Sequence, residues 1–332
     1  MPAASCPADY LYPASVFRAM PSLRAGTVYV IGGLYGNVEA LHAILRMQEA
    51  ERERGTHVEL VFNGDHNWFD IDPASFREVN QVALACASIR GNVETKIAAP
   101  SDGGCGCNYP DYVNRDYVAR SNASMARLQV TGGNFPAIRS ALGALPLWRT
   151  IEVGTQLIGI VHGDAEMLSG WSFAAERLSP MTRSCSGDKA SAELTPRTTI
   201  ERFFRESGVD AFACTHTGLA HARDFEVDGK QRLIINSGAA GLPNFAHTTF
   251  GLITRISVDD RVPPESIHGI AISGVRFDAL PVHYDQTAWV NRFLANWPPG
   301  SPAYEAYFHR IVNGADFARE DAAGGRVVRL SG

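Results

Sequence analysis

An alternation of strand-like and helix-like segments between residues 27 and 90 is the feature that most constrains this fold. Residues 27–32 are rich in β-branched and aromatic side chains and predict a strand. Residues 38–54 place Leu41 and Ile44 at helical spacing and end in a charged run before a glycine, which is typical of a helix C-terminus. The pattern continues with a strand at 58–62, a helix at 73–87 and a third short strand at 87–90. Strands separated by helices in this way predict parallel pairing with helices on the sheet faces.

The remainder of the chain continues as a mixture of helices and strands without a clear linker. Helices are expected at 120–128, 136–145, 198–207, 286–296 and 302–312, and strands at 147–153, 155–161, 209–213, 222–227, 232–236 and 248–256. The Ser/Thr-rich residues 179–196 indicate a surface loop. We therefore expect an N-terminal segment at 1–26, a main domain at 27–275 and a C-terminal helical extension of that domain at 276–332.

Composition excludes several classes of protein. Apolar residues make up 45% and charged residues 20% of the 332 residues, which argues against disorder. The formal net charge of -5 gives no electrostatic case for nucleic acid or an anionic membrane as the main partner. No apolar run reaches membrane-spanning length, and residues 1–24 do not have the pattern of a secretory signal. We therefore expect a cytoplasmic protein. The sequence is compatible with an oligomer but does not fix the oligomeric state.

Five short segments resemble, in order, the motifs of the calcineurin-like metallophosphoesterases, and the tail at 277–314 resembles the small bacterial members of that family. The segments are 33–37 (Gly-Leu-Tyr-Gly-Asn, usually Asp-x-His-Gly-Asn), 63–65 (Asn-Gly-Asp), 91–94 (Gly-Asn-Val-Glu), 161–164 (Val-His-Gly-Asp) and 214–220 (Cys-Thr-His-Thr-Gly-Leu-Ala). Each follows a predicted strand, where open α/β folds build their sites. The resemblance spans residues 27–314, with extra loops near 98–118 and 180–195. It implies an α/β fold of two stacked mixed sheets flanked by helices in four layers.

The resemblance also implies two adjacent metal ions, of which this chain keeps the ligands for one. The first ion would need Gly33, Tyr35, Asp65 and Gly218, and only the shared Asp65 is a ligand. The second ion would need Asp65, Asn92, His162 and His216, and all four are present. An alternative register would place Cys214 and His216 on the two histidine positions. Carboxylate, amide oxygen and imidazole suit hard or borderline divalent metals, so one Mn, Zn or Fe ion is expected.

Other residues near these motifs are candidates for catalysis or substrate binding. Tyr35 is a candidate ligand or proton donor, although its ring would equally fill the place of the missing ion. Asn92 and His221 are the other catalytic candidates, since Val93 stands where the family often has a histidine. Arg90 is a candidate phosphate contact. Asn37 is a candidate substrate contact, or alternatively the cap of the following helix.

Two thiols, Cys105 and Cys107, form the only close cysteine pair. They could bind a metal or be redox-active, but a glycine-rich loop with two incidental thiols is the simpler interpretation. The insertion that contains them follows a predicted metal motif and is a candidate lid.

Taken together, the resemblance predicts a metal-dependent hydrolase of small phosphate monoesters or diesters with a mononuclear site. A degenerate relative that binds a nucleotide or a protein partner without turnover is the first alternative, and chemistry at a single iron is the second. A dinucleotide-binding turn at residues 32–36 is disfavoured, because it leaves the four ligand candidates unexplained.

Overall fold

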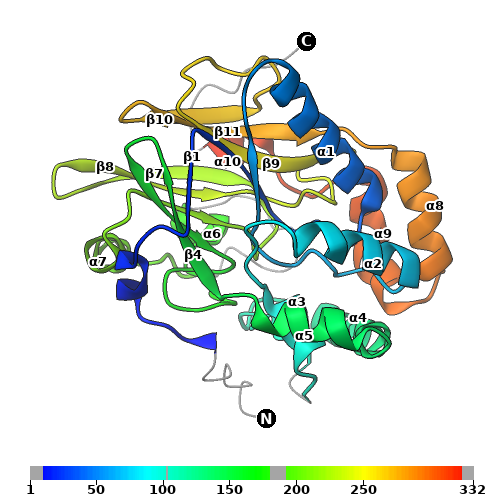
Figure 1. Cartoon of the computed structure of the whole chain (residues 1–332). Coiled ribbons are helices and arrows are strands. Elements are labelled where there is room, and N and C mark those ends of the chain that lie inside the picture. Colours follow the sequence, from blue (N-terminus) through cyan, green and yellow to red (C-terminus); the bar gives the residue numbers. More distant parts are fainter. Residues whose placement is uncertain (1–9, 102–103, 180–191, 324–332) are drawn as a thin grey trace.

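Two mixed β-sheets lie face to face with helices on their outer sides, as the computed structural model shows for residues 10–101, 104–179 and 192–323 (Figure 1). One sheet has six strands in the order β1-β4-β5-β6-β8-β7, and the other has five in the order β10-β11-β9-β2-β3. This is the α/β arrangement of two stacked sheets expected from the sequence.

The six-stranded sheet consists of β1 (Leu23–Ala25), β4 (Trp148–Val153), β5 (Gln156–Val161), β6 (Ala211–Cys214), β7 (His221–Val227) and β8 (Lys230–Asn236). The five-stranded sheet consists of β2 (Thr27–Ile31), β3 (Glu59–Phe62), β9 (Gly251–Ser257), β10 (His268–Ile272) and β11 (Val275–Val282). The pairs β2–β3, β5–β6 and β6–β8 are parallel. The carboxyl ends of these strands lie at one edge of the two-sheet stack, so the loops that follow them lie at the same edge.

Alternation along the strands explains why the sheets stack. In β2, Val28 and Val30 face the six-stranded sheet and join an aliphatic core with residues such as Ile160 and Ile235. The intervening Tyr29 joins a separate apolar cluster under the first helix. Successive side chains of a strand point to opposite faces, so a strand buried on both sides is mostly apolar. In β2 all five residues are buried, and the one polar side chain, that of Thr27, is bonded to Ser257.

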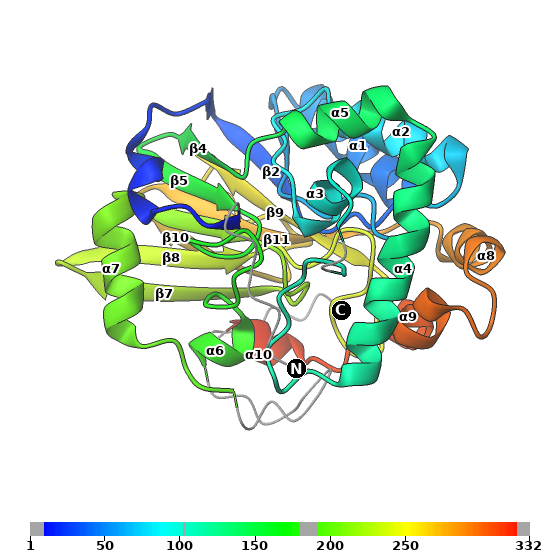
Figure 2. The same cartoon turned by 90° about the horizontal axis from the view of Figure 1, so that it is seen from below.

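The helices form the outer layers and a separate cluster beside the sheets. Near the five-stranded sheet lie α1 (Val38–Glu53), α2 (Pro73–Ala83) and α8 (Gln286–Asn296), and near the six-stranded sheet lie the 3-10 helix η2 (Ala14–Arg18) and α7 (Arg197–Ser207). The cluster seen on one side of Figure 2 contains α3 (Asn92–Ala98), α4 (Arg115–Gly133), α5 (Pro136–Ala144) and α9 (Pro302–Asn313). Two short helices, α6 (Ala175–Leu178) and α10 (Arg319–Ala323), complete the described elements. Within the described ranges, no helix has both the length and the apolar character needed to cross a membrane.

The structure differs from the sequence expectations in several places. The third strand expected at 87–90 is a single bridge between Asn63 and Ile89, because α3 begins at Asn92 and leaves no room for a longer pairing. The strands β1 and β10 were not predicted, and α4 extends well beyond the expected 120–128. The boundary expected after residue 275 falls inside β11, which is an inner strand of its sheet. Most of the loop expected at 179–196 lies outside the described residues.

Candidate metal centre

Asp65 is held in the loop after β3 by a buried carboxylate on the neighbouring helix. The backbone amides of Asp65 and His66 both donate to Glu94, at 2.8 and 3.1 Å. The Glu94 side chain also accepts from the amide of Gly91, which begins α3, so one side chain ties the loop to the helix. Asp65 itself has a positive φ of 56°, an uncommon conformation for a residue with a side chain. Its Oδ1 accepts from the amide of Val93 at 3.2 Å, which fixes the carboxylate toward α3.

Asn92 is oriented by the insertion that carries the two cysteines. Its Nδ2 donates to the Cys105 carbonyl at 3.0 Å and lies 3.3 Å from the sulfur of Cys107. A carbonyl can only accept, so this contact identifies the nitrogen and leaves the amide oxygen pointing the other way. Burial, and then a hydrogen bond with Cys105, raise the pKa of the Cys107 thiol, which is therefore neutral. The insertion contributes to the site mainly through its backbone carbonyls.

Two histidines reach the same point from the ends of neighbouring parallel strands. His162 follows β5 and its Nδ1 lies 3.0 Å from the Asn63 carbonyl, and His216 follows β6 and its Nε2 lies 2.9 Å from the Cys107 carbonyl. In each ring the nitrogen beside the carbonyl must carry the proton, since the carbonyl only accepts. The other nitrogen of each neutral ring, Nε2 of His162 and Nδ1 of His216, is left as an acceptor.

These four side chains direct acceptor atoms at one point. The Nε2 of His162 lies 3.0 Å from the amide oxygen of Asn92, 3.0 Å from Nδ1 of His216 and 3.3 Å from Oδ1 of Asp65. Acceptors this close repel one another unless a proton or a cation lies between them. Ligands about 2.0–2.1 Å from a tetrahedral ion are themselves about 3.3 Å apart, which agrees with these separations. The residues present therefore fit a divalent cation. Among the described residues, Asp65, His162 and His216 form a group whose ligand atoms all lie within 4.8 Å of one another.

The titration behaviour of the group is consistent with this charge pattern. Burial acts against a charged His162, yet the charge and hydrogen bond of Asp65 and the Asn63 carbonyl raise the pKa of His162. Burial likewise acts against a charged Asp65, but His162 and then His216 lower its pKa. Burial and the neighbouring His162 lower the pKa of His216 to about 4. A proton on His162 would take the place of a cation, and metal binding would displace it.

The Tyr35 ring occupies the space beside Gly33 and Gly218, two of the other positions that the resemblance assigns to the missing ion. A Cβ atom added to Gly33 would lie 2.4 Å from Cζ of Tyr35, and one added to Gly218 would lie 3.2 Å from its hydroxyl. A carboxylate at position 33 and the present ring are therefore mutually exclusive. Burial and then the charge of Asp65 raise the pKa of Tyr35, so its side chain is a protonated phenol.

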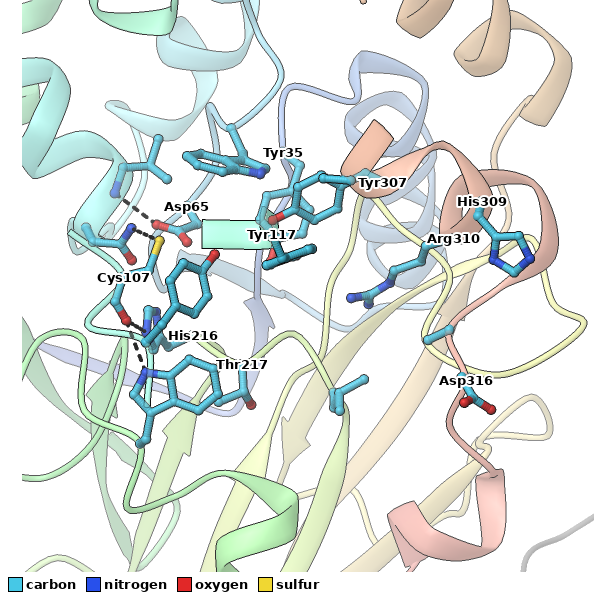
Figure 3. A pocket seen from close by; sticks show the side chains of 18 of the residues that line it. Tyr35, Asp65, Cys107, Tyr117, His216, Thr217, Tyr307, His309, Arg310 and Asp316 are labelled. Atoms are coloured by element: carbon cyan, nitrogen blue, oxygen red, sulfur yellow. Dashed lines mark hydrogen bonds between the residues drawn. The ribbon is translucent and has the colours of Figure 1, made fainter. Parts of the chain in front are cut away.

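A cavity of about 220 Å³ opens beside the cation site (Figure 3). Asp65, Asn92 and His216 line it together with Tyr35, whereas the fully buried His162 lies behind them. The insertion expected as a lid contributes to this wall through its own side chains, Cys107 and Tyr109. The remaining walls carry aromatic side chains and one guanidinium from α9.

The structure does not bring three of the sequence candidates to the cavity. Asn37 is fully buried and caps α1: its oxygen accepts from Ala40 at 3.0 Å and its nitrogen donates to the Gly241 carbonyl at 3.0 Å. Arg90 donates to the Gly143 carbonyl at the end of α5. His221 is fully buried and bonded to the Phe173 carbonyl, and burial, followed by the charge of Arg223, lowers its pKa to about 3. Their places in the fold are those of structural residues.

Sequence reasoning missed several residues of the cavity. Arg310 extends from α9 beside Tyr117 and Tyr307 in Figure 3, and Trp171 packs its ring 5.5 Å from that of His216. Nothing in their local sequence distinguishes them, because they come from the tail, from α4 and from the loop after β5. The cysteine-containing insertion was the one available signal, since it directly follows the Asn92 motif.

Comparison with solved structures identifies the fold. The chain is similar to a hypothetical protein from Pyrococcus horikoshii OT3, with a TM-score of 0.55 and 17% identity over 88% of this chain and 99% of that one. It is also similar to a metallophosphoesterase from Sphaerobacter thermophilus (TM-score 0.48, 17% identity, 84% and 97% covered) and to Vps29 of Entamoeba histolytica complexed with Zn²⁺ (0.31, 11%, 77% and 99%). No family model and no curated protein matches the sequence. The likeness to the Pyrococcus horikoshii protein shows a shared fold, and the two stacked mixed sheets flanked by helices are the architecture that the sequence predicted.

Purified protein should contain about one divalent ion per chain, and Asp65→Ala and His216→Ala should lose it, because each removes one of four converging ligands. Inductively coupled plasma mass spectrometry measures the content. Thermal unfolding with added Mn²⁺ or Zn²⁺ measures binding, since an ion at a hundred times its Kd stabilises by about 2.7 kcal/mol. His309→Ala, which removes an exposed imidazole of the same cavity, should keep the ion. Full occupancy in His216→Ala would contradict the assignment.

Gly33→Ala should lower the free energy of unfolding by about 1–3 kcal/mol, because the new methyl group would overlap the Tyr35 ring. In a Tyr35→Ala background the same change should cost much less. A double-mutant cycle in urea measures this coupling. Gly133→Ala is the control, since an added Cβ there meets nothing within 4 Å. Equal costs of Gly33→Ala in the two backgrounds would show that the ring does not fill this space.

Proposed function

We propose that this protein is a metal-dependent hydrolase of phosphate esters that uses a single divalent ion. The observation that carries the proposal is the convergence of four acceptor atoms at the edge of a cavity, with the place of a second ion filled by Tyr35. Hydrolysis adds water to phosphorus and breaks the bond to the ester oxygen, which leaves as an alcohol with one proton from the water. The bound ion would supply Lewis-acid polarisation of a phosphoryl oxygen.

The residues of the chain supply orientation and a proton donor. Asp65, Asn92, His162 and His216 would hold the ion, with Asn92 facing the cavity. The phenol of Tyr35 remains protonated and lines the same cavity, so it can donate a proton or hydrogen bond to the departing ester oxygen. A protonated phenol is a poor metal ligand, and for this reason we place iron–tyrosinate chemistry behind hydrolysis.

Arg310 supplies the positive charge that a second ion would otherwise provide. Its Nε donates to the Pro243 carbonyl at 2.9 Å and its Nη2 to the Gly218 carbonyl at 2.7 Å, which fixes the guanidinium on the cavity wall. A Cβ added to Gly218 would lie 3.6 Å from Nη1 of Arg310 and 3.2 Å from the hydroxyl of Tyr35. Guanidinium and phenol thus flank one point, where together they can bind the oxygens of a phosphoryl group.

The alternative is a protein that binds a phosphorylated ligand without turnover. It is favoured by Val93, a buried apolar residue at the position where the family often has a catalytic histidine. The same four ligands and the same Arg310 would then serve binding alone. Measuring ester hydrolysis distinguishes the hydrolase from the binding protein.

Hydrolysis of 4-nitrophenyl phosphate or bis(4-nitrophenyl) phosphate should require added Mn²⁺ or Zn²⁺ and disappear in Asp65→Ala. Release of 4-nitrophenolate measures the rate, and comparing the two esters separates monoesterase from diesterase activity. We expect a modest rate, because one ion cannot contact both the attacking and the leaving oxygen. A metal-loaded protein that binds phosphate and hydrolyses neither ester would support the binding alternative instead.

Arg310→Gln should reduce kcat/KM by about 10- to 100-fold, the usual effect of losing a hydrogen bond to a charged group. Arg310→Lys should recover part of this loss, since it keeps the charge without the fork of donors. Metal content should be unchanged in both variants. Arg120→Gln, at a half-buried arginine on α4 that does not line the cavity, is the matched control. An unchanged kcat/KM in Arg310→Gln would show that Arg310 does not contact the substrate.

A further inference from the structure

Five aromatic side chains form a continuous wall along the cavity, which we call the aromatic wall: Trp171, Tyr109, Tyr117, Tyr307 and Trp68. Consecutive ring centroids are 6.0, 5.8, 5.5 and 6.3 Å apart, so each ring touches the next. The wall begins beside the cation site, where the Trp171 ring packs 5.5 Å from that of His216. Its fourth ring, that of Tyr307, lies on α9, the helix that also carries Arg310, and its last ring, that of Trp68, lies in the loop after β3.

Four of the five residues of the aromatic wall have their polar atoms bonded within the protein. Trp171 donates to the Cys107 carbonyl at 3.1 Å, and the Tyr109 hydroxyl lies 3.1 Å from that of Ser121. Tyr117 and Tyr307 are hydrogen-bonded to each other. The wall therefore offers the cavity mainly ring surface. Ring surface in a small cavity recognises a ligand by stacking and apolar contact.

We propose that the substrate is a phosphate ester whose alcohol part carries a planar unsaturated ring. The phosphate would lie at the cation site and Arg310, and the ring would pack against the aromatic wall. This inference rests on the proposed hydrolase function and adds the class of substrate. Hydrolysis would release inorganic phosphate and the ring-bearing alcohol, with water supplying the oxygen to phosphorus and a proton to the alcohol.

Charge favours a neutral ring over the other ligand that aromatic cavities recognise, a quaternary ammonium group. Such a cation gains from ring faces but is repelled by nearby positive charge. Arg310 lines the cavity, and its Nη1 and the Tyr35 hydroxyl lie 3.6 and 3.2 Å from the position of a Cβ added to Gly218, so positive charge lies beside the phenol. The divalent ion would add further positive charge beside Trp171. A planar ring faces no such repulsion and can also stack on the guanidinium.

Benzyl phosphate and cyclohexylmethyl phosphate are a matched pair for the test, because both release a primary alcohol and differ chiefly in the planarity of the ring. We expect kcat/KM of the Mn²⁺-loaded protein to favour benzyl phosphate by about tenfold, as for a single stacking contact. Tyr117→Leu should reduce this preference to about twofold, whereas Tyr117→Phe, which keeps the ring, should retain it. Tyr304→Leu removes a tyrosine ring from α9 outside the cavity lining and should leave the preference intact.

Binding of benzylphosphonate and cyclohexylmethylphosphonate, measured by calorimetry with Mn²⁺ present, gives the same comparison without turnover. A tenfold binding preference without hydrolysis of either ester would support the aromatic wall and overturn the hydrolase. Hydrolysis of both esters with equal kcat/KM would overturn the proposed substrate class and leave the hydrolase standing. A higher kcat/KM for phosphocholine than for benzyl phosphate would also overturn the proposed substrate class, since a cationic group would then be preferred.

Discussion

The repulsion among four converging acceptor atoms is the constraint on which the rest of the site depends. Two backbone carbonyls set it up: that of Asn63 fixes the tautomer of His162, and that of Cys107 fixes the tautomer of His216. With those protons placed, the remaining ring nitrogens can only accept, and they face each other at 3.0 Å. A cation converts this unfavourable contact into a favourable one. The surrounding structure, including the carboxylate of Glu94 beneath the Asp65 loop, holds the arrangement together before any ion binds.

The resemblance assigns a second ion to a place where this chain has other groups. Gly33 and Gly218 lack the side chains that would bind it, and Tyr35 fills the space that their absence leaves. The ring could not fit beside a larger residue at position 33, and a smaller residue at 35 would leave a void in the cavity floor. Arg310 then returns a positive charge to the same region, fixed by the Gly218 carbonyl. The sequence shows which ligand types are absent at positions 33 and 218, and the structure shows the Tyr35 ring beside both glycines.

The parts of this protein that local pattern determines were predictable, and the parts that depend on distant contacts were not. Helix α1 and strand β2 follow from periodicity, and the ligand positions follow from motifs at strand ends. Strand β1 has only three residues and pairs with β4, far along the chain, so local pattern could not reveal it. Strand β10 forms a hairpin with the adjacent β11 and was missed although its partner is local. His221 and Asn37 were candidates because they stand next to motifs, but burial and backbone hydrogen bonds occupy their polar atoms. Arg310 was missed for the opposite reason, since only the packing of α9 brings it to the cavity.

The carbonyl of Cys107 joins metal binding to substrate selection. It accepts from Nε2 of His216 at 2.9 Å and from the indole of Trp171 at 3.1 Å, so a metal ligand and the first ring of the aromatic wall share one acceptor atom. A change in the insertion that shifts this carbonyl must move both. The same insertion bonds Asn92 through the Cys105 carbonyl, and it therefore orients two of the four ligands as well as the wall. An insertion of this kind cannot vary freely in sequence as most surface loops do, because its backbone determines the geometry of the ion and the position of the ring surface together.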